Sequence, residues 1–188
     1  MSLPETRSTS RPAVRRGLLA GVVLTAALAS ACTVRPLYSN APLSPGSTAT
    51  AQSELASIAV KPVTTRYAQQ VRNNLIFAFT GGKERTDNPL YSLDLNVTEL
   101  VQTAATVQIS KDQDQPTAGT VTLTSRYRLT DAKTGKVVST GTRSMSASYD
   151  KPNQEFASYR AQLDAENRAA RELAEILNLA IAQDLAKR

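Results

Sequence analysis

The sequence predicts an α+β fold: a small, mainly antiparallel sheet in the order strand, helix, strand, strand, strand, helix, with two helices packed on one face. Three observations support this prediction. Apolar and polar residues alternate over much of the stretch from 91 to 149, which is typical of half-buried strands. Apolar residues recur at helical spacing in residues 66–80 and again from 156 to about 186. Polar turns containing Gly or Pro separate these segments.

The first strand and helix are both short. A strand is expected over residues 56–61, because its apolar residues alternate and Pro62, which has no backbone donor, stops it. A helix is expected over residues 66–80, after threonines that can cap it and before Gly81-Gly82, which accept positive φ. The residues predicted to form its buried face are Tyr67, Val71, Leu75 and Ala78.

Three further strands should form an antiparallel meander. The first has an apolar face that Glu99 interrupts, and its alternation is compatible either with one long strand or with a bulge around Gln102-Thr103. Residues Lys111–Gly119 are predicted to form a polar turn that projects from the sheet toward a partner. The residues expected on the apolar faces of the first two strands are Tyr91, Leu93, Leu95, Val97, Val101, Val121, Leu123, Ser125, Tyr127 and Leu129. The third strand, Val137–Tyr149, is rich in Ser and Thr.

The last element is a long amphipathic helix. It should begin after Pro152, with Asn153 as its candidate cap, and continue to about Ala186. Charged residues on its other faces are typical of a solvated surface. Its predicted apolar face consists of Phe156, Tyr159, Leu163, Ala170, Leu173, Leu177 and Ala180.

The N-terminus has the pattern of a bacterial lipoprotein signal. Cys32, the only cysteine, ends an uncharged stretch over residues 17–31 that follows three arginines. The apolar run is too short to span a bilayer, which needs about 20 apolar residues. We therefore expect residues 1–31 to be removed and Cys32 to become acylated. Ala29 departs from this pattern, since leucine is most common there. The alternatives are an ordinary signal peptide followed by a free thiol, and a buried apolar helix.

Residues 32–53 are expected to form a lipidated N-terminus and flexible tether, followed by one domain over residues 54–188. The tether prediction depends on a stretch rich in Pro, Ser, Gly, Asn, Thr and Ala that lacks hydrophobic periodicity. Two or more acyl chains anchor a protein stably to a membrane. Thr33 follows the cysteine in place of the aspartate that commonly retains lipoproteins at the inner membrane. The expected location is therefore the periplasmic side of the outer membrane.

Composition argues against several classes of function. The chain contains no histidine, its single cysteine is assigned to lipid, and it has no glycine-rich phosphate loop. We therefore expect no catalytic residues, no metal site and no cofactor. Without residues 1–31, which contain four arginines and one glutamate, the chain has 18 basic and 15 acidic residues. This small excess of positive charge gives no argument for nucleic-acid binding.

Several short motifs follow one another along the chain. They are a cysteine followed by Pro-Leu-Tyr at Ala31–Tyr38, Ile58–Pro62, Arg66–Leu75, Pro89–Leu95, Tyr127–Asp131, Gly135, Ser148-Tyr149, Asp164-Ala165 and Arg168–Ala170. Each motif is weakly specific alone, but their order is a stronger signal. In this order they resemble the motifs of alphaproteobacterial lipopolysaccharide-assembly lipoproteins, the LptE family, and the resemblance covers nearly all of residues 29–187.

The resemblance implies binding and assembly without chemistry. Proteins of this family sit in the lumen of the outer-membrane β-barrel LptD, assist the assembly of that barrel and take part in lipopolysaccharide delivery to the cell surface. Large barrel interiors are polar, and a sheet rich in hydroxyl groups would suit them. The residues expected to supply that surface are Thr120, Thr122, Thr124, Ser139, Thr140, Thr142, Ser144, Ser146 and Ser148. Such residues also occur on any solvated sheet face.

Lipopolysaccharide carries phosphates, which Arg and Lys bind through charge-assisted hydrogen bonds. The first candidates for this contact are Arg126 and Arg128, which share one strand face. The second candidates are Lys111 and Lys136, which lie in turns at opposite ends of the hairpin. Exposed basic residues often contact only water and bind no ligand. The alternative function is an accessory lipoprotein of an ABC-type lipid transporter. Such a protein should co-purify with an inner-membrane permease, and an LptE-like protein with a large outer-membrane barrel.

Overall fold

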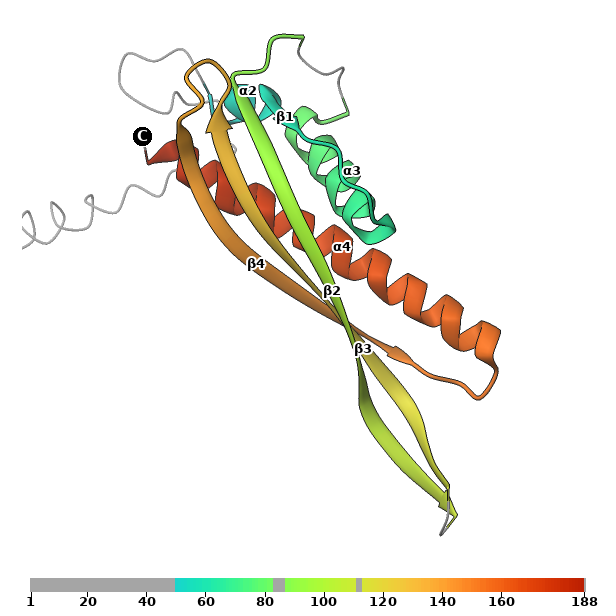
Figure 1. Cartoon of the computed structure of the whole chain (residues 1–188). Helices are drawn as coiled ribbons and strands as arrows, with labels where there is room; N and C mark the ends of the chain where they lie inside the picture. The colour runs from blue at the N-terminus through green and yellow to red at the C-terminus, as the bar shows by residue number, and fades with distance from the viewer. Residues whose placement is uncertain (1–49, 83–86, 111–112, 188) are drawn as a thin grey trace, which may run out of the picture. The chain divides into compact units, whose positions relative to one another are not determined.

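The chain forms two layers, a four-stranded sheet and a helical layer on one of its faces (Figure 1). The computed structural model describes residues 50–82, 87–110 and 113–187, which all belong to one compact unit. The elements are α2 (Ala51–Ala56), β1 (Ile58–Val60), α3 (Arg66–Thr80), β2 (Tyr91–Ser110), β3 (Gln113–Asp131), β4 (Val137–Asp150) and α4 (Glu155–Ala186).

The strands lie in the order β1-β2-β3-β4. β1 is parallel to β2, and the other neighbouring strands are antiparallel. This confirms the predicted α+β class and the meander of three long strands. The parallel pair follows from α3, which connects β1 to β2 as a crossover helix.

The core lies between the sheet and the two longer helices, α3 and α4. Alternate residues of β2 and β3 face these helices, and the side chains of Leu93, Leu123 and Leu129 are fully buried there. Burying a leucine side chain stabilises a fold by about 1.5–3 kcal/mol. The α4 residues that complete this core with full burial are Ala165, Ala169, Ala170, Leu173, Leu177, Ile181 and Ala182. Hydrophobic burial thus fixes which face of the sheet the helices cover.

Two tyrosines pack across the sheet onto glycines of the neighbouring strand. Tyr127 on β3 is paired with Gly141 on β4, and Tyr149 on β4 is paired with Gly119 on β3. A Cβ atom at Gly141 would lie 2.6 Å from the Tyr127 hydroxyl oxygen, and one at Gly119 would lie 2.5 Å from the Tyr149 ring. Only glycine therefore fits opposite each ring, which explains two glycines inside strands.

Several boundaries differ from the sequence prediction. The strand predicted over 56–61 covers only Ile58–Val60, because Ala56 ends helix α2 and Ser57 caps it. Helix α2 was not predicted. It includes residues 51–53, which the sequence assigned to the tether, and it begins with a capping box between Thr50 and Ser53.

The prediction of a polar turn over Lys111–Gly119 is wrong, because β3 already begins at Gln113. β4 pairs with β3 only as far as Ala118, opposite Asp150, so the end of the β2–β3 hairpin continues as two strands beyond β4 (Figure 1). Register shifts in β2 lie between Thr103 and Ala105 and between Ala105 and Thr106, next to the predicted bulge at Gln102-Thr103. Strand pairing overrides the turn preference of this polar segment.

Helix α3 has the predicted bounds and ends at Thr80, and its C-cap residue is Gly81, whose φ is 62°. The N-cap residue of helix α4 is Gln154, one residue later than the predicted Asn153, and its side chain makes no capping hydrogen bond. Phe156 and Tyr159, predicted as core, are 76% and 56% exposed, because burial on α4 begins at Ala165. Val101 on β2, also predicted as core, is 40% exposed.

Candidate functional site

The face of the sheet opposite the helices is lined by hydroxyl, amide and charged side chains. We call this face the outer face. Its residues lie at alternate positions of β2, β3 and β4, and the residues between them lie on the side of the sheet that the helices cover. The hydroxyl residues of the outer face are Ser92, Thr98, Thr120, Thr122, Thr124, Thr130, Thr140, Thr142, Ser144, Ser146 and Ser148. This set contains eight of the nine hydroxyl residues predicted from the sequence.

The ninth predicted hydroxyl, Ser139, lies on the helix side of the sheet. It is paired with the buried Leu129, and its hydroxyl donates a hydrogen bond to Asp184 Oδ2 on α4. A register shift between Leu129 and Thr130 breaks the simple alternation at this end of β4. The prediction for Ser139 was therefore wrong, because alternation alone does not reveal the shift.

Hydroxyls of neighbouring strands form cross-strand pairs on the outer face. The Oγ atoms of Thr122 and Ser146 are 2.8 Å apart, and those of Thr120 and Ser148 are 3.3 Å apart. Such pairs stabilise an antiparallel sheet modestly. Each hydroxyl also keeps lone pairs that can accept bonds from a partner, so the face can both donate and accept hydrogen bonds.

A shallow, open depression of about 710 Å³ lies on the outer face near the ends of β1 and β4. We call it the sheet depression. Its lining includes the cations Lys61, Arg126 and Arg128, and one acid, Asp94. The remaining lining residues are Asn96, Tyr127, Thr130, Gly135, Val137, Thr140, Gly141 and Thr142. The depression is therefore polar, and its lining has more positive than negative charges.

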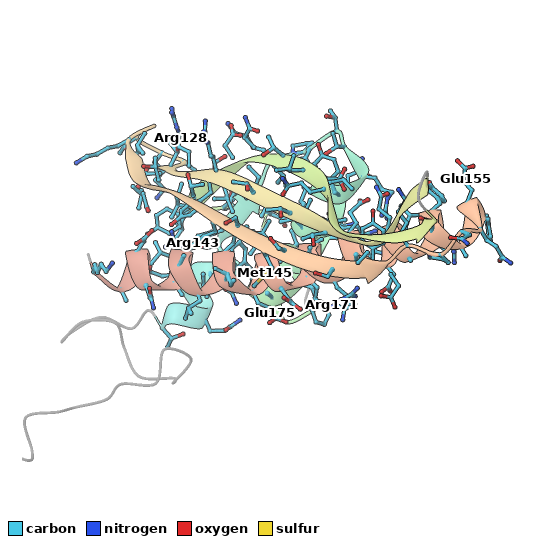
Figure 2. The ribbon with its side chains drawn as sticks, turned by 90° about the horizontal axis from the view of Figure 1, so that it is seen from below. Arg128, Arg143, Met145, Glu155, Arg171 and Glu175 are labelled. Carbon is cyan, nitrogen blue, oxygen red and sulfur yellow. The ribbon has the colours of Figure 1, made fainter. Side chains whose placement is uncertain are left out.

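Arg126 and Arg128, the first candidates from the sequence, both lie on the outer face and line the sheet depression. Figure 2 shows Arg128 on the side of the sheet away from α4, whereas Arg143 of β4 lies on the side of α4. Within the described ranges, no hydrogen bond or ion pair joins the side chain of Arg126 or Arg128 to another residue. Both guanidinium groups are therefore available to an anionic ligand.

The second candidates lie elsewhere. Lys136 is exposed in the turn after Gly135, whose φ of 69° allows that turn, but it does not line the sheet depression. Asp131 shapes the turn by accepting backbone bonds from Lys133 and Thr134, 3.0 and 2.8 Å long. Lys111 lies outside the described residues, as do Cys32 and the predicted signal over residues 1–31.

The sequence missed Lys61 and Asp94. The Nζ atom of Lys61 lies 3.0 Å from Asp94 Oδ2, and the two side chains are 56% and 54% exposed. This pair forms because β1 is parallel to β2 and places Lys61, the residue after β1, beside Asp94 on β2. The sequence signal, a lysine before the strand-ending Pro62, could not be interpreted without knowing that pairing.

A charged cluster lies on the opposite, helix-covered side of the sheet. Arg66 of α3 forms a 2.9 Å ion pair with Glu166 of α4 and donates a 3.1 Å hydrogen bond to Asn167. Burial raises the pKa of Glu99 on β2, the Glu166 carboxylate raises it further, and Arg66 opposes both effects. Glu99 Oε1 is buried without a hydrogen-bond partner. The cluster connects α3, β2 and α4.

Within residues 50–82, 87–110 and 113–187, no group of three or more Asp, Glu, His or Cys residues is placed to hold a metal ion.

Across the same part of the chain, none of the helices combines the length and the apolar character needed to cross a membrane.

Comparisons with known proteins found similar solved structures and a matching family model. A protein from Caulobacter crescentus CB15, described as a candidate lipoprotein, is similar with 29% sequence identity and a TM-score of 0.60, over 73% of this chain and 97% of that chain. The rare lipoprotein B from Shewanella oneidensis is 11% identical with a TM-score of 0.50, over 69% of this chain and 95% of that chain, which shows a shared fold. No match was found among curated proteins.

The model of the LptE family, described as lipopolysaccharide-assembly, matches residues 55–181. This match runs from the end of α2 into the last turns of α4, and therefore includes all four strands of the sheet. The chain belongs to the LptE family of lipopolysaccharide-assembly proteins.

Proposed function

We propose that this chain is an acylated lipoprotein of the outer membrane that sits within an LptD-like β-barrel, assists the assembly of that barrel and contributes to lipopolysaccharide delivery. The observation that carries the proposal is the outer face, a hydroxyl-rich surface on the side of the sheet away from α3 and α4. It contains two arginines whose side chains form no ion pair within the described residues. The family match supports the role in lipopolysaccharide assembly. The signal that ends at Cys32 supports the lipid anchor.

The outer face suits the lumen of a large barrel because barrel interiors are polar. Its serine and threonine hydroxyls are short and can act as donors or acceptors, so they can match a wall of mixed polar side chains. The face has few large apolar residues; Leu100 on β2, 54% exposed, is one of them. A face of this kind would be a poor contact for lipid tails and a good one for a hydrated protein wall.

The sheet depression supports the contact with lipopolysaccharide. Arg126 and Arg128 lie two residues apart on one strand, so their side chains emerge on the same side. Guanidinium groups bind phosphate oxygens in a bidentate manner, and this geometry gives specificity as well as affinity. We assign these two arginines to the phosphate groups of lipopolysaccharide. The protein's role on this account is binding and positioning, without catalysis.

Affinity capture tests the proposed partner. The full chain is expressed with its signal, captured from detergent-solubilised outer membranes, and the attached proteins are identified. We expect a large outer-membrane barrel to remain bound. An inner-membrane permease complex in its place would support the transporter-accessory alternative and contradict our proposal. Mass spectrometry of the same material should show acylation of Cys32, and an unmodified residue would contradict the anchor.

A binding measurement tests the proposed ligand. Arg126→Glu combined with Arg128→Glu should weaken lipopolysaccharide binding by at least tenfold, because each charge-assisted bond contributes about 1.5–3 kcal/mol. The matched control is Arg160→Glu combined with Arg171→Glu, which makes the same charge change at two exposed positions of α4. Equal weakening by both pairs would show that only net charge matters, and the assignment to the sheet depression would be wrong.

A further inference from the structure

Asp94 has two cationic neighbours and is bound to only one of them. In the β2–β3 ladder it lies directly opposite Arg128. Directly opposite residues in such a ladder have Cβ atoms about 4.5–5.5 Å apart, close enough for opposite charges to pair. The Asp94 carboxylate nevertheless lies 3.0 Å from Lys61 Nζ, and no ion pair joins it to Arg128. The choice of partner leaves Arg128 without a counter-charge in the described structure.

The backbone of Lys61 is held in place from two sides. Its N–H donates a 2.9 Å hydrogen bond to the carbonyl of Leu93 on β2, which extends the parallel pairing by one residue. Its carbonyl accepts a 3.0 Å bond from Arg72 Nε of α3. Arg72 also binds the carbonyl of Val60, at 3.2 Å, and Pro62 stops the strand immediately afterwards. The fold therefore fixes the point from which the Lys61 side chain reaches Asp94.

We propose that Lys61 is a positioning residue that holds Asp94 and thereby keeps Arg128 free to bind a phosphate group of the ligand. This inference rests on the proposed function, since it concerns the same sheet depression. Without Lys61, the depression would lose one cation, and Asp94 would turn to Arg128 and neutralise a second. The loss of one surface lysine would thus remove more binding than its own charge accounts for.

The alternative is that Lys61 contributes only its own positive charge. It would do so either by direct contact with a phosphate group or by making the electrostatic potential of the sheet depression more positive. The two mechanisms differ in how Asp94 behaves. If Lys61 holds Asp94, removing the Asp94 charge should change the affinity for lipopolysaccharide little while Lys61 is present. The same change should raise the affinity strongly when Lys61 is absent. If the two charges act independently, removing Asp94 should have the same effect in both backgrounds.

A double-mutant cycle separates these mechanisms. The full chain in mild detergent is titrated with purified lipopolysaccharide as the wild type, Lys61→Met, Asp94→Asn and the double variant. We expect Lys61→Met to weaken binding about tenfold or more, a loss on the scale of one charge-assisted bond. Asp94→Asn alone should change affinity by less than about twofold, because an exposed pair contributes little by itself. In the Lys61→Met background, Asp94→Asn should recover at least half of the lost affinity on a logarithmic scale.

Three controls accompany the cycle. Lys61→Arg preserves the ion pair and should bind as the wild type does. Asp164→Asn removes the acid of another exposed pair, Asp164–Arg168 on α4, and should leave affinity unchanged. Thermal melting should be similar for all variants, because the Lys61–Asp94 pair is about half exposed. If Lys61→Met fails to fold, Lys61→Gln takes its place in the cycle.

Additive effects of Lys61→Met and Asp94→Asn would overturn this inference while leaving the proposed function intact, provided that the Arg126→Glu, Arg128→Glu variant loses binding. If that arginine variant binds lipopolysaccharide normally, the proposed ligand site and this inference both fail. Coupling between Lys61 and Asp94 together with loss of binding in the arginine variant is the result that supports both.

Discussion

The hydroxyl of Tyr127 on β3 donates a 2.9 Å hydrogen bond to the carboxylate of Asp184 near the end of α4. Ser139 of β4 donates to the same oxygen, so one acid of the helix joins two strands of the sheet. At the other end of β4, Tyr149 donates a 3.4 Å bond to Gln162 of α4. These bonds join α4 to β3 and to both ends of β4, on the face of the sheet that hydrophobic burial already selects.

Removing the Tyr127 hydroxyl should loosen this attachment. Tyr127→Phe keeps the ring over Gly141 and removes the hydroxyl that binds Asp184. Hydrogen bonds to charged groups contribute about 1.5–3 kcal/mol, and Ser139 still binds the carboxylate, so we expect a loss of about 1–2 kcal/mol in the free energy of unfolding. Urea denaturation measures it. Tyr67→Phe, a partly buried tyrosine of α3, is the control, and equal losses in both variants would contradict a specific role for Asp184.

Gly141 should not tolerate a side chain. A Cβ atom there would lie 2.6 Å from the Tyr127 hydroxyl oxygen, so Gly141→Ala must displace the ring and break its bond to Asp184. Forcing extra atoms into a packed region destabilises a fold by about 1–3 kcal/mol. Ser144→Ala on the outer face of the same strand is the control and should have little effect. An unchanged melting temperature for Gly141→Ala would show that the ring moves freely.

The ion pair between Arg66 and Glu166 should stabilise the contact between α3 and α4. The Glu166 side chain is only 7% exposed, so Arg66→Met would leave a buried carboxylate without its counter-charge. Breaking a fully buried pair destabilises by about 3–5 kcal/mol. Because the Arg66 side chain is 44% exposed, water would compensate in part, and we expect a loss nearer about 2 kcal/mol in urea denaturation. Arg171→Met on the exposed face of α4 should be neutral, and an equal loss there would argue against the pair.

Glu99 should make stability depend on pH. Burial first, and then the Glu166 carboxylate, raise the pKa of Glu99 above its ordinary 4.5, while Arg66 lowers it. The folded state therefore holds this proton more tightly than the unfolded state does. The resulting stabilisation is fully present below about pH 4.5 and is lost as the pH rises through the raised pKa.

Glu99→Gln should remove this dependence, because an amide side chain has no proton that titrates in this pH range. Denaturation followed between pH 4 and pH 8 measures the effect, and Glu175→Gln on the exposed face of α4 is the control. The assignment to Glu99 would be contradicted if the free energy of unfolding of the wild type rose with pH just above 4.5 and if Glu99→Gln left this pH dependence unchanged.

Local patterns predicted most of the fold. Period-two alternation identified the buried set from Tyr91 to Val97 and from Val121 to Leu129, and the Gly81-Gly82 pair marked the end of α3. Patterns failed where the result depends on distant partners. Phe156 and Tyr159 continue the apolar stripe of α4, but burial on that helix begins only at Ala165.

The candidate site was predictable only in part. Arg126 and Arg128 could be placed on one face because strand residues two apart share a side. Lys61 and Asp94 are 33 residues apart in sequence, so their contact could not be foreseen without the parallel pairing of β1 with β2. Ser139 was assigned to the wrong face because a register shift is invisible in composition.

We infer that the outer face contacts the barrel during lipopolysaccharide assembly. Photo-crosslinking in living cells tests this contact directly, from a light-activated residue at Ser144, in the middle of β4, compared with the same residue at Glu175 on the exposed face of α4 (Figure 2). We expect a strong crosslink from position 144 to a large outer-membrane barrel. Crosslinks only from position 175, or an adduct with an inner-membrane permease, would contradict it.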